Sequence, residues 1–274
     1  MSNFRTILTG WGLVFFLVIL VPSRSYAQDG DEDRDIYKLS IAGDWWFSHP
    51  SGYFNGKDKE GYFDINRDFG FSNYSTFTGA VDWRFKRKHH LLFAATPLIS
   101  SRTATLTRTI EFQGQTFDVG TSATAKVTSL AFGPGYQYDI IRRNRGYLAI
   151  AVQLELLDTT ASLTANGSVN NQSASRSASG SFFAPLPVFG PRFRWYPLPH
   201  SSRFSIDGNV QGMYFFGYGD FVSSRATLNF GLTQHLRAHG GYQLGTRFSI
   251  HGTTDNIGIR LTQKGPVAGL EYRW

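Results

Sequence analysis

The chain has 274 residues, a formal net charge of +7, and an aromatic content of 16%. It contains no cysteine, which excludes disulfides, thiolate metal sites, a cysteine nucleophile and a lipid-modified N-terminal cysteine. Its 29 glycines and mean hydropathy of −0.23 indicate an all-β protein whose strands have one apolar and one polar face.

The first 27 residues predict a cleaved secretion signal. Arg5 precedes an apolar run over residues 7–21, and small residues stand just before the predicted cleavage point. The alternative is a membrane anchor, but the run is shorter than the ~20 residues that a spanning helix needs. Residues 28–36 are then predicted to form an acidic, solvated linker, and residues 37–274 to form one domain.

The rest of the chain alternates by two between apolar and polar side chains, which predicts antiparallel strands. In residues 77–85, for example, Phe77, Val81 and Trp83 share one face, while Asp82 lies on the other. About ten such segments occur, although eight or twelve strands would also fit. They are residues 37–48, 75–85, 91–101, 126–139, 147–157, 183–195, 204–216, 222–233, 240–250 and 257–274. Each is near the ~9–11 residues that a tilted strand needs to cross a bilayer.

Connectors of two kinds alternate between these segments. The short ones are often basic, as in KRKHH (86–90) and RRNRG (142–146), and their histidines are predicted to be solvated. These basic turns could meet anionic lipid head groups. The others are longer and polar, which is the pattern of an outer-membrane barrel. Because the chain is predicted to be exported and its positive charge lies in short clusters, nucleic acid is not an expected partner.

Two of the long connectors are predicted to continue as strands above the membrane plane. These are residues 61–71, which keep the apolar phase of the following strand, and residues 107–120, which turn at Gln113 and Gly114. Within the first of them, DINRDFG begins like a calcium loop. It lacks the Gly and Glu that such a loop needs later, so a polar strand face is the preferred interpretation.

A Gly-Pro pair recurs at residues 133–134, 190–191 and 265–266, always on a segment that runs toward the short turns. Glycine bends a strand, and proline removes a backbone donor, so shared bulge chemistry is the preferred interpretation. Pro185 and Pro187 weaken the prediction of a strand over residues 183–195 for the same reason.

Full charges occupy the polar faces, whereas bulky aromatic rings occupy the apolar faces and gather at segment ends. So many rings would crowd a soluble core, but Tyr and Trp suit a membrane surface. The aromatic face is therefore predicted to meet lipid and the charged face to line a lumen. The predicted lumen charges are Asp44, Asp82, Arg84, Glu155, Arg192, Arg194, Asp207, Arg225, Arg247, Glu271 and Arg273. A salt-bridged plug is the preferred interpretation because a ten-strand interior is narrow; a small charged channel is the alternative.

The chain ends LEYRW, with Ala268, Leu270, Tyr272 and Trp274 at alternating positions. This ending resembles the C-terminal insertion signal of Gram-negative outer-membrane β-barrel proteins, which usually end in Phe. The resemblance implies a place in the outer membrane, contact with its lipid and lipopolysaccharide, and recognition of the last strand by the barrel assembly machinery. The omptin proteases also have ten strands, but no motif of theirs matches this sequence.

The expected role is structural, surface-loop interaction, or a narrow channel with a charge-filled lumen. One alternative is a hydrolase of lipid or peptide at the outer rim, where Ser249 with His251 and His49 with Ser51 are candidate pairs. No acid that would orient either histidine is identifiable. The other alternative is a small-solute porin. No cofactor or metal is expected, and the oligomeric state is left open.

Overall fold

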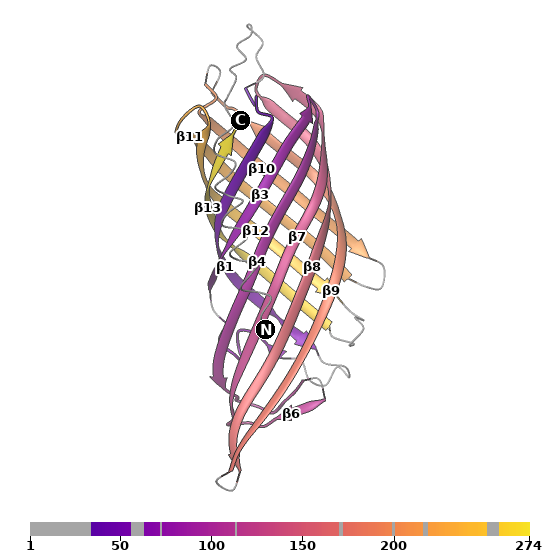
Figure 1. Ribbon diagram of the computed structural model, residues 1–274, viewed down its shortest axis with the longest axis vertical. Helices are drawn as coiled ribbons and strands as arrows, with labels where there is room; N and C mark the ends of the chain where they lie inside the picture. Colours follow the sequence, from indigo (N-terminus) through magenta and orange to yellow (C-terminus); the bar gives the residue numbers. More distant parts are fainter. Residues whose placement is uncertain are drawn as a thin grey trace.

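Ten antiparallel strands close into a barrel in the computed structural model, which describes residues 34–55, 63–71, 73–112, 114–169, 172–198, 201–215, 219–250 and 258–274. The ten are β1 (Leu39–Asn55), β3 (Tyr74–Lys86), β4 (His89–Thr105), β7 (Ser122–Arg143), β8 (Gly146–Val169), β9 (Gln172–Trp195), β10 (Phe204–Phe215), β11 (Gly219–Gly231), β12 (Leu236–Ile250) and β13 (Gly258–Arg273). Each pairs with its neighbours in chain order (Figure 1). The predicted fold class and strand number are confirmed.

The last strand pairs with the first, which removes the open edges that hydrocarbon would not tolerate. β13 lies antiparallel to β1 from Ser40 opposite Arg273 to Asn55 opposite Gly258. Beyond the ladder, the Lys38 amide donates to the Trp274 carbonyl at 2.7 Å. The chain terminus is therefore part of the barrel wall.

The outer wall has an apolar band of limited height. On β8, the exposed side chains run from Leu148 through Val152 to Leu154, and then change to Asp158 and Thr160. The apolar part is close to the ~9–11 residues that span a bilayer. The rest of the β8–β9 hairpin continues past the band, and Figure 1 shows it reaching beyond the other strands at one end.

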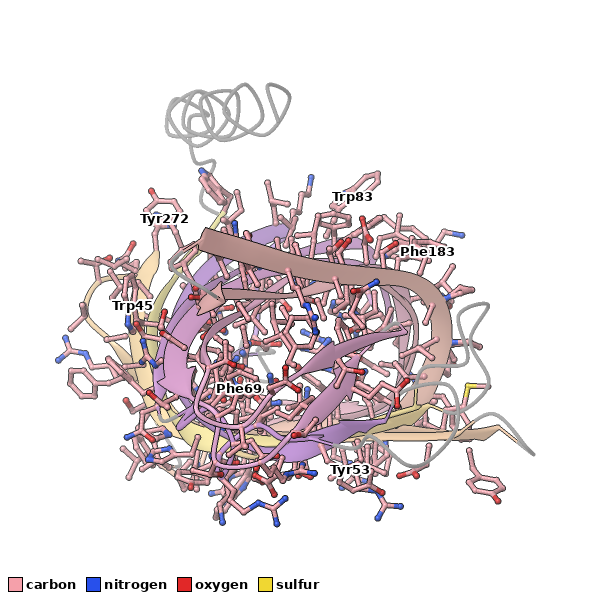
Figure 2. All side chains as sticks on the ribbon, turned by 90° about the horizontal axis from the view of Figure 1, so that it is seen from below. Trp45, Tyr53, Phe69, Trp83, Phe183 and Tyr272 are labelled. Atoms are coloured by element: carbon pink, nitrogen blue, oxygen red, sulfur yellow. The ribbon has the colours of Figure 1, made fainter. Side chains whose placement is uncertain are left out.

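Aromatic side chains lie on the outside of this wall. Trp45, Trp83, Phe183 and Tyr272 are exposed and point away from the barrel, whereas Phe69 lies inside it (Figure 2). The predicted assignment of faces is therefore confirmed for these rings. Among the described residues, no helix is long and apolar enough to span a membrane.

The three Gly-Pro pairs interrupt ladders, as the missing proline donor predicts, but the register is the same on both sides of each gap, so the predicted bulges are wrong at these ladders. Pairing skips residues 133–134 between β7 and β8, 190–191 between β9 and β10, and 265–266 between β13 and β1. At Gly190 and Gly265, an added Cβ would overlap a carbonyl oxygen of the neighbouring strand. The prolines face outward, so β9 remains a strand despite its prolines.

The two long connectors do not extend the wall; they fold over the lumen as a cap. In the first, β2 (Phe63–Asp64) pairs with β1, and the chain then turns over residues 65–69, so the prediction of a strand through residue 71 is wrong. In the second, β5 (Ile110–Phe112) and β6 (Gln115–Phe117) form the predicted hairpin, but as a separate two-stranded sheet.

The cap has an apolar core that packs against small side chains of the inner wall. We define the cap core as Ile65, Phe69, Phe71, Leu106, Ile110, Phe112 and Phe117. It belongs to one buried cluster with the inward residues Ala123 and Ala125 of β7 and Ala161, Leu163 and Ala165 of β8. Small side chains on the wall leave room for the phenylalanine rings, so the outer part of the lumen is apolar.

Candidate functional site

A plug closes the end of the lumen where the short turns lie, and Asp35 is its centre. The Asp35 carboxylate is completely buried. Its Oδ1 accepts hydrogen bonds from Arg194 Nη1 at 2.9 Å, Arg273 Nη1 at 3.0 Å and the Tyr196 hydroxyl at 2.9 Å. Its Oδ2 lies 3.6 Å from Arg142 Nη2. The predicted solvated linker is therefore wrong at Asp35, because three arginines from three strands draw the carboxylate inside.

The charge state of Asp35 follows from this surrounding. Burial alone would raise the pKa of the carboxyl, but Arg194, Arg273 and Arg142 outweigh it and hold the pKa well below its usual range. Asp35 is therefore an anion at every physiological pH. Four hydrogen-bonding or charged partners compensate for its burial.

The Tyr37 ring and a fourth arginine, Arg84, complete the plug. Tyr37 is buried, and its hydroxyl donates to Asp82 Oδ2 at 3.0 Å. The guanidinium of Arg84 lies 5.1 Å from the Tyr37 ring centre, that of Arg273 lies 5.0 Å from it, and Arg84 Nη1 donates to the Asp35 carbonyl at 2.7 Å. The two guanidinium groups therefore pack against the Tyr37 ring, which the N-terminal segment places in the lumen.

His90 is buried in the plug, although its turn position predicted a solvated side chain. Its Nδ1 lies 2.8 Å from Asp82 Oδ1, and its Nε2 lies 3.3 Å from Asp139 Oδ2. Arg142, in the basic run predicted to meet lipid, instead donates from Nη1 to Asp139 Oδ2 at 2.5 Å. The prediction for His90 is wrong, and Arg142 is removed from the set that could meet lipid, because the strand alternation continues into the turns and aims these two side chains inward.

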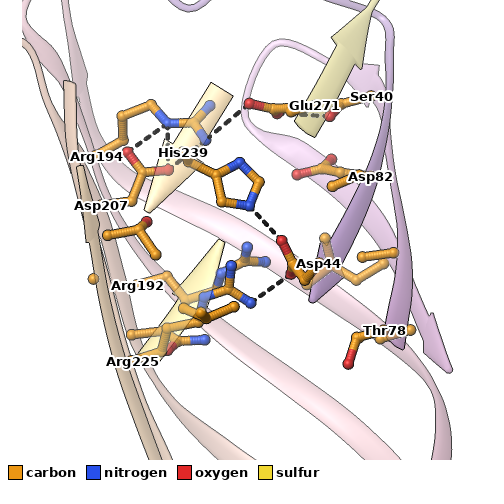
Figure 3. Close-up of a pocket in the computed structure, with 18 of the residues that line it drawn as sticks. Ser40, Asp44, Thr78, Asp82, Arg192, Arg194, Asp207, Arg225, His239 and Glu271 are labelled. Carbon is orange, nitrogen blue, oxygen red and sulfur yellow. Dashed lines mark hydrogen bonds and ion pairs between the residues drawn. The ribbon is translucent and has the colours of Figure 1, made fainter. Parts of the chain in front are cut away.

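Further into the barrel, acids and arginines continue to pair. Arg194 Nε donates to both carboxylate oxygens of Asp207, at 2.9 and 2.8 Å (Figure 3). Glu271 accepts from Arg273 Nη2 at 2.8 Å and from the Ser40 hydroxyl at 2.6 Å. Each of these carboxylates has a cation beside it, which is what burial of a charge requires.

A polar chamber lies above the plug, with a cavity volume of about 320 Å³. Asp44 projects from β1 and accepts a hydrogen bond from Arg225 Nη1 at 2.6 Å, and it also contacts His239 Nε2 (Figure 3). Arg192 and Glu155 line the same chamber, and neither has an ion-pair partner among the residues that the structure describes. Arg247 pairs through its backbone with Val222 and Thr262, but its side chain lies outside the described residues.

Of the two predicted catalytic pairs, the structure describes the side chains of only His49 and Ser51. His49 and Ser51 are exposed on the outward face of β1, away from the lumen. The backbone of Ser249 pairs with Asp220 and Arg260, whereas its side chain and His251 lie outside the described residues. Within the described part of the chain, no group of three or more His, Asp and Glu side chains could hold a metal ion.

Asp68, the second aspartate of the DINRDFG stretch, stabilises the cap. Asp68 accepts hydrogen bonds from Arg108 Nη2 at 2.6 Å and Arg67 Nε at 3.1 Å, and from the Asp64 amide at 2.9 Å. Burial alone would raise the pKa of Asp68, but these hydrogen bonds lower it to about 2. The interpretation as a polar strand face is wrong, since the segment is a turn that joins the cap's two halves by an ion pair.

Sequence reasoning missed several residues of the lumen. His90 and His239 could have been found, since each stands in the inward phase of its strand beside Leu92 or Arg237. The local sequence does not predict that Asp35 or Tyr196 faces the lumen. Asp35 precedes β1 and Tyr196 follows β9, so neither belongs to a strand's alternation, and long-range contacts bring both side chains inside.

No family model and no curated protein matches this sequence. Among solved structures, the outer membrane protease OmpT from Escherichia coli is similar with a TM-score of 0.54 and 13% identity, over 88% of this chain and 100% of that one. Ail of Yersinia pestis, solved with the heparin analogue sucrose octasulfate, matches with a TM-score of 0.37 and 10% identity over 86% and 99% of the two chains. OprG from Pseudomonas aeruginosa matches at 0.35 and 11% over 89% and 99%.

The likeness to OmpT concerns the fold, because 13% identity transfers no site. It agrees with the closed ten-strand topology described above. The chain has the fold of the Gram-negative outer-membrane β-barrel proteins.

Proposed function

We propose that this protein is an integral outer-membrane barrel whose lumen is plugged, and which works by presenting its β8–β9 hairpin and capped loops at the cell surface. The burial of Asp35 among Arg142, Arg194 and Arg273 carries this proposal. An N-terminal segment that three arginines hold across the lumen would block an open pore.

The energetics favour a closed lumen at rest. Withdrawing Asp35 would leave three arginines beside one another in a narrow interior, and breaking a buried ion pair costs about 3–5 kcal/mol. Barrels of this strand number also have interiors that side chains nearly fill. Passage of solutes would therefore require the plug to move.

A narrow channel gated by the plug is the second candidate, favoured by the chamber of about 320 Å³ that lies behind it. A hydrolase at the outer rim has no support from His49 and Ser51, because both side chains face outward toward the membrane side of the wall.

The proposed partners follow from the two surfaces. The exposed aromatic wall would contact outer-membrane lipid and lipopolysaccharide. The outward-facing Ala268, Leu270 and Tyr272, with Trp274 at the end, would be recognised by the barrel assembly machinery. The mature chain would begin after Ala27, once the signal is removed.

Single-channel recording in planar bilayers tests the proposal with the mature chain, residues 28–274. Wild type should be silent, and so should Phe112→Ala, which loosens only the cap. The double variant Asp35→Ala/Phe112→Ala should conduct, because plug and cap are both loosened. Asp118→Ala/Phe112→Ala is the matched control, since Asp118 is exposed near the β5–β6 hairpin, and it should stay silent. Steady conductance of wild type would support a small-solute pore instead. A silent Asp35→Ala/Phe112→Ala would overturn the role given to the plug.

A further inference from the structure

The chamber has a row of inward side chains that spans three neighbouring strands. Asn209 of β10 is the register partner of Arg192 on β9 and of Arg225 on β11. All three line the cavity, together with Trp46 and Asp44 of β1. Figure 3 shows Arg192 and Arg225 reaching into the lumen on the side that faces Asp44.

This row has hydrogen-bonding groups that the protein itself does not satisfy. Arg225 is paired with Asp44, but Arg192 has no hydrogen-bond or ion-pair partner among the described residues. The Trp46 side chain is 9% exposed, and its Nε1 is buried with no partner. The Asn209 Oδ1 is likewise buried with no partner. Buried polar groups are normally hydrogen-bonded, so these groups, which line one cavity, indicate a ligand.

No neighbouring carboxylate forms an ion pair with Arg192 among the described residues, although Asp82 attracts it over a longer distance. Asp44 is engaged by Arg225 and His239, and Asp207 by Arg194. Asp82 and Glu271 bond to His90 and to Arg273. Glu155 stands six residues along β8 from Ala149, the register partner of Arg192, which places its backbone ~20 Å further along that strand.

We propose that this chamber binds a small molecule through a carboxylate or phosphate group. The Arg192 guanidinium would hold the group with a bidentate pair of hydrogen bonds, for which its planar fork is suited. The Trp46 N–H would donate a further bond, and the Asn209 carbonyl oxygen would accept one from a hydroxyl of the ligand. The cavity of about 320 Å³ is large enough for such a molecule.

Equilibrium dialysis tests the site in the detergent-solubilised mature protein. Radiolabelled inorganic phosphate and succinate are the two probes, and overnight equilibration makes the result independent of slow entry past the plug. Wild type should bind one equivalent of at least one probe, and Arg192→Gln should bind it at least ~10-fold more weakly, the loss of about 1.4 kcal/mol. Arg192→Lys, which keeps the charge without the fork, should fall between them.

Arg203→Gln is the matched control, because Arg203 is exposed in the turn before β10; it should bind like wild type. Heat-modifiable migration on gels verifies that each variant is folded. Binding of phosphate alone, succinate alone or both identifies the ligand chemistry. No binding of either probe at ~10 mM, or equal binding by wild type and Arg192→Gln, would overturn the proposal. Conductance plays no part in this readout, so the site can fail without the plug failing.

Discussion

Truncating one phenylalanine of the cap core should release the cap while leaving the barrel folded. Phe112 and Phe117 are only 2% and 1% exposed, and Phe→Ala at such a site costs about 3–5 kcal/mol. The β5–β6 hairpin that carries them has three residue pairs in its ladder, too few to persist without packing. Phe112→Ala should therefore open residues 106–121 locally, since low-stability segments unfold independently of a stable core.

Hydrogen exchange with mass spectrometry measures this opening. A loss of 3–5 kcal/mol corresponds to exchange that is about 10² to 4 × 10³ times faster in the hairpin, with little change in β8 to β13. Val119→Ala is the control, because Val119 is 59% exposed in the adjoining turn, and it should change protection by less than ~0.5 kcal/mol. Unchanged hairpin exchange in Phe112→Ala would refute the claim that apolar packing holds the cap over the lumen.

Three further predictions concern the cap's ion pair, the lipid face and the close approach of two strands at Gly265. The folded pKa of Asp68 is about 2, below its ordinary 3.8, so its stabilisation is present above pH ~4 and is lost as the pH falls toward 2. Pepsin sensitivity of the cap should rise over that range in wild type more than in Asp68→Asn, and identical profiles would contradict this. Val152→Arg, in the apolar band, should lower the free energy of unfolding by ~2–4 kcal/mol, measured in guanidinium from lipid vesicles. Thr160→Arg, beyond the band, should lower it by only ~0–1 kcal/mol. Equal losses would contradict the predicted membrane border. Gly265→Val should lower the yield of folded barrel, because its Cβ overlaps a neighbouring carbonyl, whereas Gly79→Val has open space and should fold normally; the reverse ranking would count against the close approach of the two strands at Gly265.

The barrel wall could be predicted because lipid imposes a pattern with a period of two. Val81 and Trp83 face out, while Asp82 between them faces the lumen, and this relation survives any change in strand length or register. The Gly-Pro pairs were predictable for a similar reason, since proline lacks a donor wherever it stands. Local chemistry determines these features, so a single sequence is sufficient to find them.

The cap and plug could not be predicted in the same way, because they depend on contacts between distant segments. Residues 63, 65, 69 and 71 keep a strand's apolar phase, yet the chain turns at residues 65–69 and buries Ile65, Phe69 and Phe71 against β7 and β8. The small residues Ala123, Ala125, Ala161 and Ala165 were a usable signal. A lumen wall of alanines implies that something apolar covers it, since water would otherwise face them.

The inner surface changes character along the barrel, and that change makes the two proposals separable. Charges paired to Asp35 fill the end with the short turns, alanines and phenylalanines fill the other, and Arg192 lies between them in the polar chamber. Asp35 acts through the plug, so adding Asp35→Ala to the cap variant Phe112→Ala should change conductance, while Asp35→Ala should still show one bound equivalent in dialysis. Arg192 acts through the ligand, so Arg192→Gln should weaken binding at least ~10-fold while the bilayer stays silent. A variant of either residue that moved both readouts would mean that plug and chamber are one mechanical unit, in which ligand binding helps to keep the N-terminal segment in place.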